Sequence, residues 1–135
     1  MDNHPITLKS VFFTKTVVIA VPNHQPTEGG KVLSGPQNNL NGEKIKDTPG
    51  HYVATMQTKI NLDQDVTYPY LIDMECVGVF VADDTLSEED AHRGIMITAH
   101  SVLYGAIREA VAWITGRHPY GQLMLGLSVI QPNKQ

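Results

Sequence analysis

The sequence predicts an α+β domain, with a four-stranded antiparallel sheet, one long helix packed on one face and an extended C-terminal segment. Several segments in the first two thirds alternate apolar and polar side chains, as half-buried strands do. A later stretch repeats apolar side chains at helical spacing between a start signal and a stop signal. Strands followed by a helix are typical of the α+β class. The length of 135 residues fits one domain, so residues 1–135 are treated as a single domain.

The first predicted strand covers residues 11–21. Its odd positions are apolar apart from Lys15, so they are expected on one face. Residues 22–50 then contain Gly-Gly, Gly-Pro, Asn-Gly and Pro-Gly pairs, which exclude one long regular element. Within that stretch we predict only a short strand at residues 39–46.

The next two strands are predicted to form a hairpin. In residues 52–62 the even positions are mostly apolar and the odd positions mostly polar, as in an antiparallel strand with one solvated or partner-facing side. A polar turn at residues 61–65 separates this strand from the next one, at residues 68–82. Cys76 falls on the same face as Ile72, Met74 and Phe80, which predicts a buried side chain rather than a nucleophile.

The long helix is predicted to begin after Ser87, an N-cap residue followed by acids that suit the helix dipole. Gly116 is expected as the C′ residue, and Pro119 prevents continuation. The helix has two neighbouring apolar stripes, a wider apolar face than packing on one sheet requires. The first stripe is Ala91, Ile95, Val102, Ala106, Ala110 and Trp113, and the second is Leu103, Ile107, Val111 and Ile114.

After the helix, residues 123–130 alternate in an extended pattern in which both faces are largely apolar. Leu123, Leu125 and Val129 lie on one face of this pattern, together with Leu127. A segment that is apolar on both faces is expected to be covered on both sides or to form part of a groove.

Charge and composition exclude several classes of protein. The net charge is −4, and a nucleic-acid partner would require a basic footprint. No apolar run reaches the about 20 residues of a membrane-spanning helix, and the N-terminus has no secretory signal pattern. A single cysteine fits a reducing compartment. We therefore expect a soluble cytoplasmic protein.

No pattern in the sequence points to catalysis, a metal or a cofactor. The six histidines are scattered and lack the spacing of metal ligands. Asp83, Asp84 and the acids at residues 88–90 could form a cation site or an acid–base pair, but a turn and a helix start explain them better. Gly29 and Gly30 match no phosphate-binding pattern. We predict that the protein is not an enzyme and uses no cofactor or metal.

Motifs at three places carry a resemblance to a known family. They are an aromatic-Thr-Lys strand, an apolar-Leu-x-acid run followed by Gly-apolar-Phe, and a helix with a Gly-Arg-x-Pro end. In this chain they are Phe13-Thr14-Lys15, Tyr70-Leu71-Ile72-Asp73 with Gly78-Val79-Phe80, and Val102-Leu103-Tyr104 with Gly116-Arg117-His118-Pro119. Through them the chain resembles SecB, the bacterial protein-export chaperone, over most of residues 8–130.

The resemblance implies an ATP-independent holdase that binds non-native polypeptide clients in hydrophobic grooves of a homotetramer, built as a dimer of dimers. It assigns client contact to Leu103, Tyr104, Leu123, Leu125 and Val129. It assigns the contacts between subunits to the first strand and the long helix, with Phe13, Lys15, Val17, Ala106, Ala110 and Trp113 as candidates.

Two departures from the family bear on protein export. The resemblance implies a contact with the translocase motor SecA through Leu71 and Asp73, but the family's first-strand acids fall on Thr16 and Ala20 here. The family's second C-terminal helix and acidic tail have no counterpart in residues 1–135. Both departures favour a stand-alone SecB-like chaperone, including those that serve toxin–antitoxin systems or mobile elements, over coupling to SecA.

Two other classes of function stay open at this point. One is a small-molecule-binding or enzymatic α+β domain with a pocket between helix and sheet, which would require polar groups that converge on one cavity. The other is a structural or assembly module that uses the same oligomer without binding clients. High affinity for one folded partner would distinguish that module from a holdase.

Overall fold

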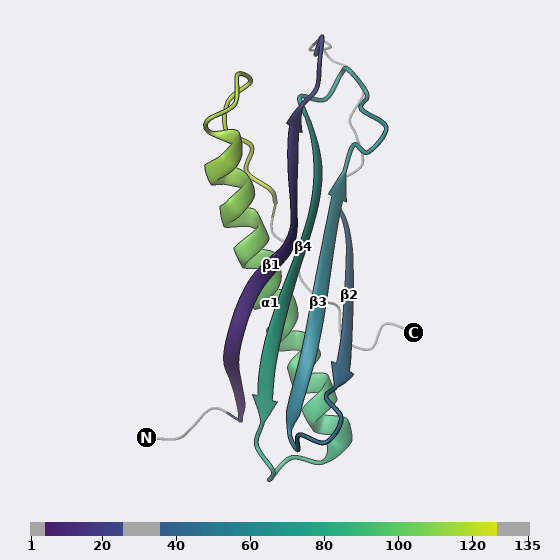
Figure 1. Cartoon of the computed structure of the whole chain (residues 1–135), viewed down its shortest axis with the longest axis vertical. Coiled ribbons are helices and arrows are strands. Elements are labelled where there is room, and N and C mark those ends of the chain that lie inside the picture. Colours follow the sequence, from purple (N-terminus) through teal and green to yellow (C-terminus); the bar gives the residue numbers. More distant parts are fainter. Residues whose placement is uncertain (1–4, 26–35, 127–135) are drawn as a thin grey trace.

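The computed structural model describes residues 5–25 and 36–126, which form two layers, a four-stranded antiparallel sheet and one long helix (Figure 1). The strands are β1 (Ile6–Ala20), β2 (Gln37–Lys44), β3 (His51–Ile60) and β4 (Tyr70–Ala82), and the helix is α1 (Glu88–Thr115). The order in the sheet is β1-β4-β3-β2, with β1 and β2 at the edges. The predicted α+β class with one long helix on the sheet is confirmed.

β3 and β4 form the predicted hairpin, in which Tyr52 lies opposite Phe80 and Ile60 opposite Ile72. Asn61 allows the chain to leave β3 because it adopts a left-handed φ of 54°, which asparagine tolerates better than most residues. Its side-chain amide donates to the carbonyl of Tyr70 at 3.2 Å and so holds the start of β4. The short strand predicted at residues 39–46 is also present, as β2, two residues earlier.

β1 differs from its predicted alternation because two irregularities interrupt its pairing with β4, between Leu8 and Ser10 and between Phe13 and Lys15. Each bulge inserts a residue and changes which later side chains share a face. Residues directly opposite one another point to the same face of a sheet. Phe13, opposite Cys76, therefore lies on the helix side, whereas Val17 lies on the outer side. The single apolar face predicted for residues 11–21 is wrong.

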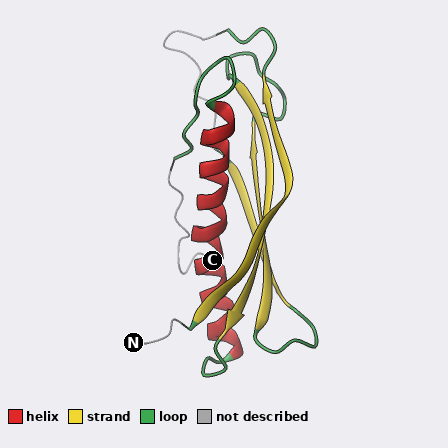
Figure 2. Ribbon diagram, turned by 60° about the vertical axis from the view of Figure 1, so that its left-hand side comes forward, coloured by secondary structure: helices red, strands yellow, loops and turns green. Residues whose placement is uncertain are grey.

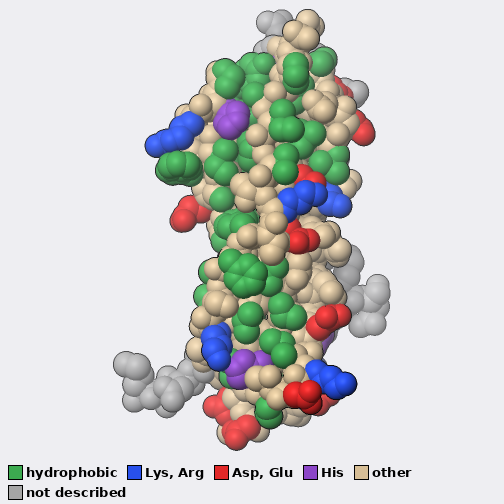
Figure 3. All heavy atoms as spheres, viewed as in Figure 1, with side chains coloured by type: hydrophobic (Ala, Val, Ile, Leu, Met, Phe, Trp, Pro, Cys, Tyr) green, Lys and Arg blue, Asp and Glu red, His purple; other side chains and the backbone are tan. Residues whose placement is uncertain are grey.

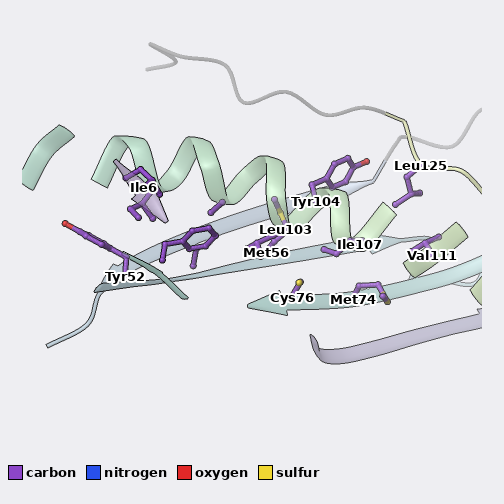
Figure 4. Packing of buried hydrophobic residues seen from close by; sticks show 14 of the residues in the cluster. Ile6, Tyr52, Met56, Met74, Cys76, Leu103, Tyr104, Ile107, Val111 and Leu125 are labelled. Atoms are coloured by element: carbon purple, nitrogen blue, oxygen red, sulfur yellow. The ribbon is translucent and has the colours of Figure 1, made fainter. Parts of the chain in front are cut away.

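The core lies between α1 and the even-numbered side chains of β3 and β4 (Figure 4). Cys76 is buried there as predicted, and burial raises the pKa of its thiol to about 11. Most side chains that α1 buries are spaced by four residues: Ala91, Ile95, Ala99, Leu103, Ile107, Val111 and Thr115, with Tyr104 and Ala112 buried beside this stripe. Because an α-helix repeats every 3.6 residues, such a stripe drifts around the helix and can follow a twisted sheet.

This buried stripe corrects the one predicted for the helix. Val102, Ala106 and Ala110 are only partly buried, and Trp113 is 61% exposed. Four-residue spacing selects Leu103, Ile107 and Val111 for the sheet side of α1. Of the first predicted stripe, Ala91 and Ile95 are buried, whereas its later residues lie at the margin of the core or beyond it.

The predicted helix start is confirmed at Ser87, whose hydroxyl accepts a hydrogen bond from the Asp90 N–H at 3.1 Å. The helix ends at Thr115, with Gly116 as the C-cap residue. Gly116 has a right-handed φ of −61°, so the left-handed conformation typical of a C′ glycine is not found there. The chain instead reverses at Gly121, whose φ is 87°.

Replacing Ser87 with alanine is expected to lower the free energy of unfolding by about 1 kcal/mol, because the Asp90 N–H loses its acceptor. Urea denaturation followed by circular dichroism measures the difference. Ser101→Ala is the matched control, since Ser101 lies exposed within α1 and caps nothing. An equal loss in both variants would contradict a capping role for Ser87.

Candidate functional site

Residues 121–126, called the return segment here, lie alongside α1 after the chain reverses. In Figure 2 this segment follows the upper end of α1 and descends beside the helix. The Tyr70 hydroxyl donates to the carbonyl of Gly121. The Leu123 N–H donates to Oγ1 of Thr115 at 2.8 Å. These two bonds fix the first half of the return segment against β4 and the last turn of α1.

Two side chains of α1 hold the second half of the return segment. Arg108 Nε donates to the carbonyl of Leu125 at 2.9 Å, and the Tyr104 hydroxyl donates to the carbonyl of Gly126 at 2.8 Å. Burial has the largest effect on the pKa of the Tyr104 hydroxyl and raises it. The hydroxyl therefore keeps its proton at neutral pH and can donate a hydrogen bond. The second half of the return segment is thus bound through backbone carbonyls, which every polypeptide carries.

The side chains of the return segment divide between the core and solvent. Leu125 is only 4% exposed and belongs to the core, and in Figure 4 it lies beside α1 near Tyr104 and Val111. Met124 is 60% exposed. The alternation of inward and outward side chains expected from the sequence is therefore present at these two positions.

The residues assigned to client contact are not equally accessible. Leu103, Tyr104 and Leu125 are buried, and Leu123 is partly buried against the core. Val129 lies outside the described residues. Sequence reasoning did not find the roles of Arg108 and Thr115 in holding the return segment. Their signal would have been the chain reversal at Gly121, which only the folded backbone reveals.

β1 exposes an unusual number of apolar side chains. Leu8, Val11 and Phe13 lie on the helix side, as their partners on β4 show, yet all three side chains stay exposed. Phe12 and Ile19 are exposed on the outer side. β1 is therefore an edge strand with apolar side chains accessible on both faces.

The outward side of α1 carries the other interface candidates. Ala106 and Ala110 are partly buried at the edge of the core. Trp113 is largely exposed, and the Arg117 guanidinium lies 4.1 Å from the centre of its ring. Such a cation–π contact shields one face of the indole and leaves the rest accessible.

The outer face of the sheet has a charged band between apolar areas (Figure 3). Lys15 and Asp73 form an ion pair at 2.7 Å across β1 and β4. Beside them, Gln57 and Thr14 donate to Glu75, and these hydrogen bonds lower the pKa of its carboxyl group. Asp73 is thus already paired.

Leu71, the second residue assigned to a SecA contact, lies on the same outer face opposite Ile19. It is almost completely buried. Neither Leu71 nor Asp73 therefore presents a free group to a partner in this state of the protein.

The acidic residues just before the helix take part in a turn. Asp83 Oδ1 accepts a hydrogen bond from the Thr85 N–H at 2.9 Å, and this bond is the main cause of its lowered pKa. Within residues 5–25 and 36–126, no three His, Cys, Asp or Glu side chains gather where they could hold a metal ion. In the same residues, no helix is long and apolar enough to cross a membrane.

The comparisons with known proteins concern mainly the fold. No protein-family model matches the chain, and no curated protein sequence matches it. A solved structure of a SecB-like chaperone from Mycobacterium tuberculosis, in complex with a peptide from the HigA1 antitoxin, is similar with a TM-score of 0.66 and 19% identity, over 92% of this chain and 91% of that one. A Streptococcus agalactiae protein of unknown function is similar with a TM-score of 0.57 and 10% identity, over 90% of this chain and 97% of that one. The chain has a SecB-like fold.

Proposed function

We propose that this protein is an ATP-independent holdase that binds non-native polypeptides on apolar surfaces of a homo-oligomer. The observation that carries the proposal is the exposure of five apolar side chains along β1: Leu8, Val11, Phe12, Phe13 and Ile19. Leu8, Val11 and Phe13 share the helix side of β1, and Phe12 and Ile19 lie on its outer side. Exposed apolar side chains that gather on a folded domain mark an interaction site. Burial of apolar area is non-directional, so such a surface can accept many client sequences.

The fold supports a polypeptide as the ligand. The similar SecB-like chaperone was solved with a peptide from an antitoxin, and we propose clients of the same chemical class for this chain. The described part of the protein shows no group of metal-binding side chains that would favour a metalloenzyme instead. Extended, apolar, non-native segments are therefore the expected ligands.

We further propose that the oligomer is a tetramer, assembled as a dimer of dimers through the outer backbone edge of β1 and the outward side of α1, so that the side chains on both faces of β1 stay accessible to clients. Ala106 and Ala110 are small enough to let a second helix approach, and Trp113 would gain the burial that it lacks in one chain. A cytoplasmic location goes with this proposal, because the one cysteine, Cys76, is a buried free thiol. We do not propose that the protein binds SecA, since Leu71 is buried and Asp73 is paired with Lys15.

The test is light scattering of chemically denatured rhodanese diluted with and without the protein. We expect scattering to be suppressed at about one oligomer per client, with both proteins co-eluting in size-exclusion chromatography. Val11→Asp should weaken the protection because it places a charge on the apolar surface of β1. Asn41→Asp is the matched control, since Asn41 is exposed on the polar edge strand β2.

A well-folded wild-type oligomer that leaves rhodanese unprotected would contradict the holdase proposal. High affinity for one folded partner under the same conditions would point instead to an assembly module with this fold. Equal weakening by Val11→Asp and Asn41→Asp would show that protection does not depend on β1.

A further inference from the structure

We infer that the return segment occupies the place of a client backbone, so that client binding displaces residues 121–126 from α1. This inference rests on the proposed function and adds to the apolar surface of β1 a second place where a client binds, together with the segment it competes with there. The chain's own segment is an extended polypeptide bound on α1. The surface beneath it, here called the seat, is formed by Tyr104, Arg108 and Thr115 together with the pocket that holds Leu125.

The seat recognises features that any extended chain has. Tyr104 and Arg108 donate to two successive carbonyl groups, those of Gly126 and Leu125, at 2.8 and 2.9 Å. In these two hydrogen bonds, neither donor bonds to a side chain of the return segment. A client backbone in the same position would restore both hydrogen bonds, so exchange leaves no buried donor without an acceptor.

The seat also offers an acceptor and an apolar pocket. Oγ1 of Thr115 donates to the carbonyl of Val111 at 2.6 Å and accepts the Leu123 N–H at 2.8 Å. Leu125 fills the adjoining pocket and is almost completely buried. The preferred occupant is therefore an extended segment with one leucine-sized apolar side chain two residues after a free backbone N–H.

Release of the return segment would break no hydrogen bond of the sheet and none within α1. The segment belongs to neither the sheet nor α1, and side chains supply the hydrogen bonds that hold residues 122–126. Of its apolar side chains, Leu125 is buried, Leu123 is partly buried against the core and Met124 is exposed. A site that is filled most of the time lowers the apparent affinity by the fraction of molecules in which it is open.

The first experiment compares wild-type protein, Leu125→Ala and Met124→Ala for binding to fluorescently labelled, reduced and alkylated α-lactalbumin, a chain that stays unfolded. Leu125→Ala loosens the return segment and leaves the seat intact, so its Kd should fall about three- to tenfold. Met124→Ala changes the exposed neighbour and should leave the Kd unchanged.

An unchanged or higher Kd for Leu125→Ala would overturn the inference, because Leu125 would then not compete with the client. Binding by the wild type in that case would leave the holdase proposal standing. A wild type that does not bind α-lactalbumin at all would defeat the holdase proposal itself, and the inference with it.

Hydrogen–deuterium exchange of the wild-type protein is a second test of the displacement, and it does not depend on how well a variant folds. The N–H of Leu123, which Thr115 protects in the free protein, should exchange faster when the client is bound. Amides of α1 should exchange no faster. A return segment that stays equally protected or becomes more protected on client binding would overturn the inference.

Discussion

Replacing Ala106 with arginine is expected to convert the proposed tetramer into a smaller species. Ala106 lies on the outward side of α1, partly buried, on the stripe that leads through Ala110 to the exposed Trp113. A helix from another subunit that packs there would meet a long charged side chain in every copy. Burying an unpaired charge costs on the order of several kcal/mol per ion, enough to separate subunits joined through that surface.

Size-exclusion chromatography with multi-angle light scattering measures the mass directly. Asn41→Arg is the matched control, because it adds the same side chain at an exposed position of β2, the strand at the sheet edge away from β1. We expect the control to keep the wild-type mass. A folded Ala106→Arg protein with unchanged mass would show that this side of α1 is not an interface between subunits.

How much of this fold could be predicted depended on how local each signal is. β3 and β4 were found because regular alternation reports one buried face, and their even-numbered side chains are indeed buried. β1 was misassigned because a bulge leaves no mark in an alternating pattern. An extra residue before Lys15 divides the apolar side chains between both faces of the sheet.

The helix shows a second limit of prediction from the sequence. Its start followed from a capping residue, and Ser87 caps it as predicted. The two neighbouring apolar stripes were predicted as one wide face, and the twist of the sheet decides which of their residues are buried. Leu103 and Ile107 reach the core, whereas Ala106 remains at its edge.

The return segment marks the third limit. Its apolar pattern predicted a covered segment or part of a groove, and Leu125 is covered. The groups that hold it were not predictable, because a hydrogen bond from Arg108 to a backbone carbonyl depends on where the chain reverses and on no side chain of the acceptor. Contacts to backbone leave no pattern in the sequence of the segment that is bound.

Replacing Phe80 with alanine is expected to cost about 3–5 kcal/mol of unfolding free energy, as such substitutions in a packed core do. Phe80 is completely buried on the helix side of β4. Its ring lies over Gly78, where an added Cβ would come within 2.7 Å of Cε1 of Phe80 and 3.1 Å of Cδ2 of Leu103. The absent side chain of Gly78 thus makes room for the ring, and alanine at position 80 would leave a cavity there.

A loss of this size is a large share of the about 5–15 kcal/mol that stabilises a typical domain, so urea denaturation at fixed protein concentration should show a much lower midpoint. Phe12→Ala is the matched control, because the same atoms are removed from a ring that is 48% exposed on the outer face of β1. It should cost less than about 1 kcal/mol, as surface substitutions usually do. Equal losses in the two variants would mean that both faces of the sheet are buried in the assembled protein, and the outer face would then have to be counted among the subunit contacts.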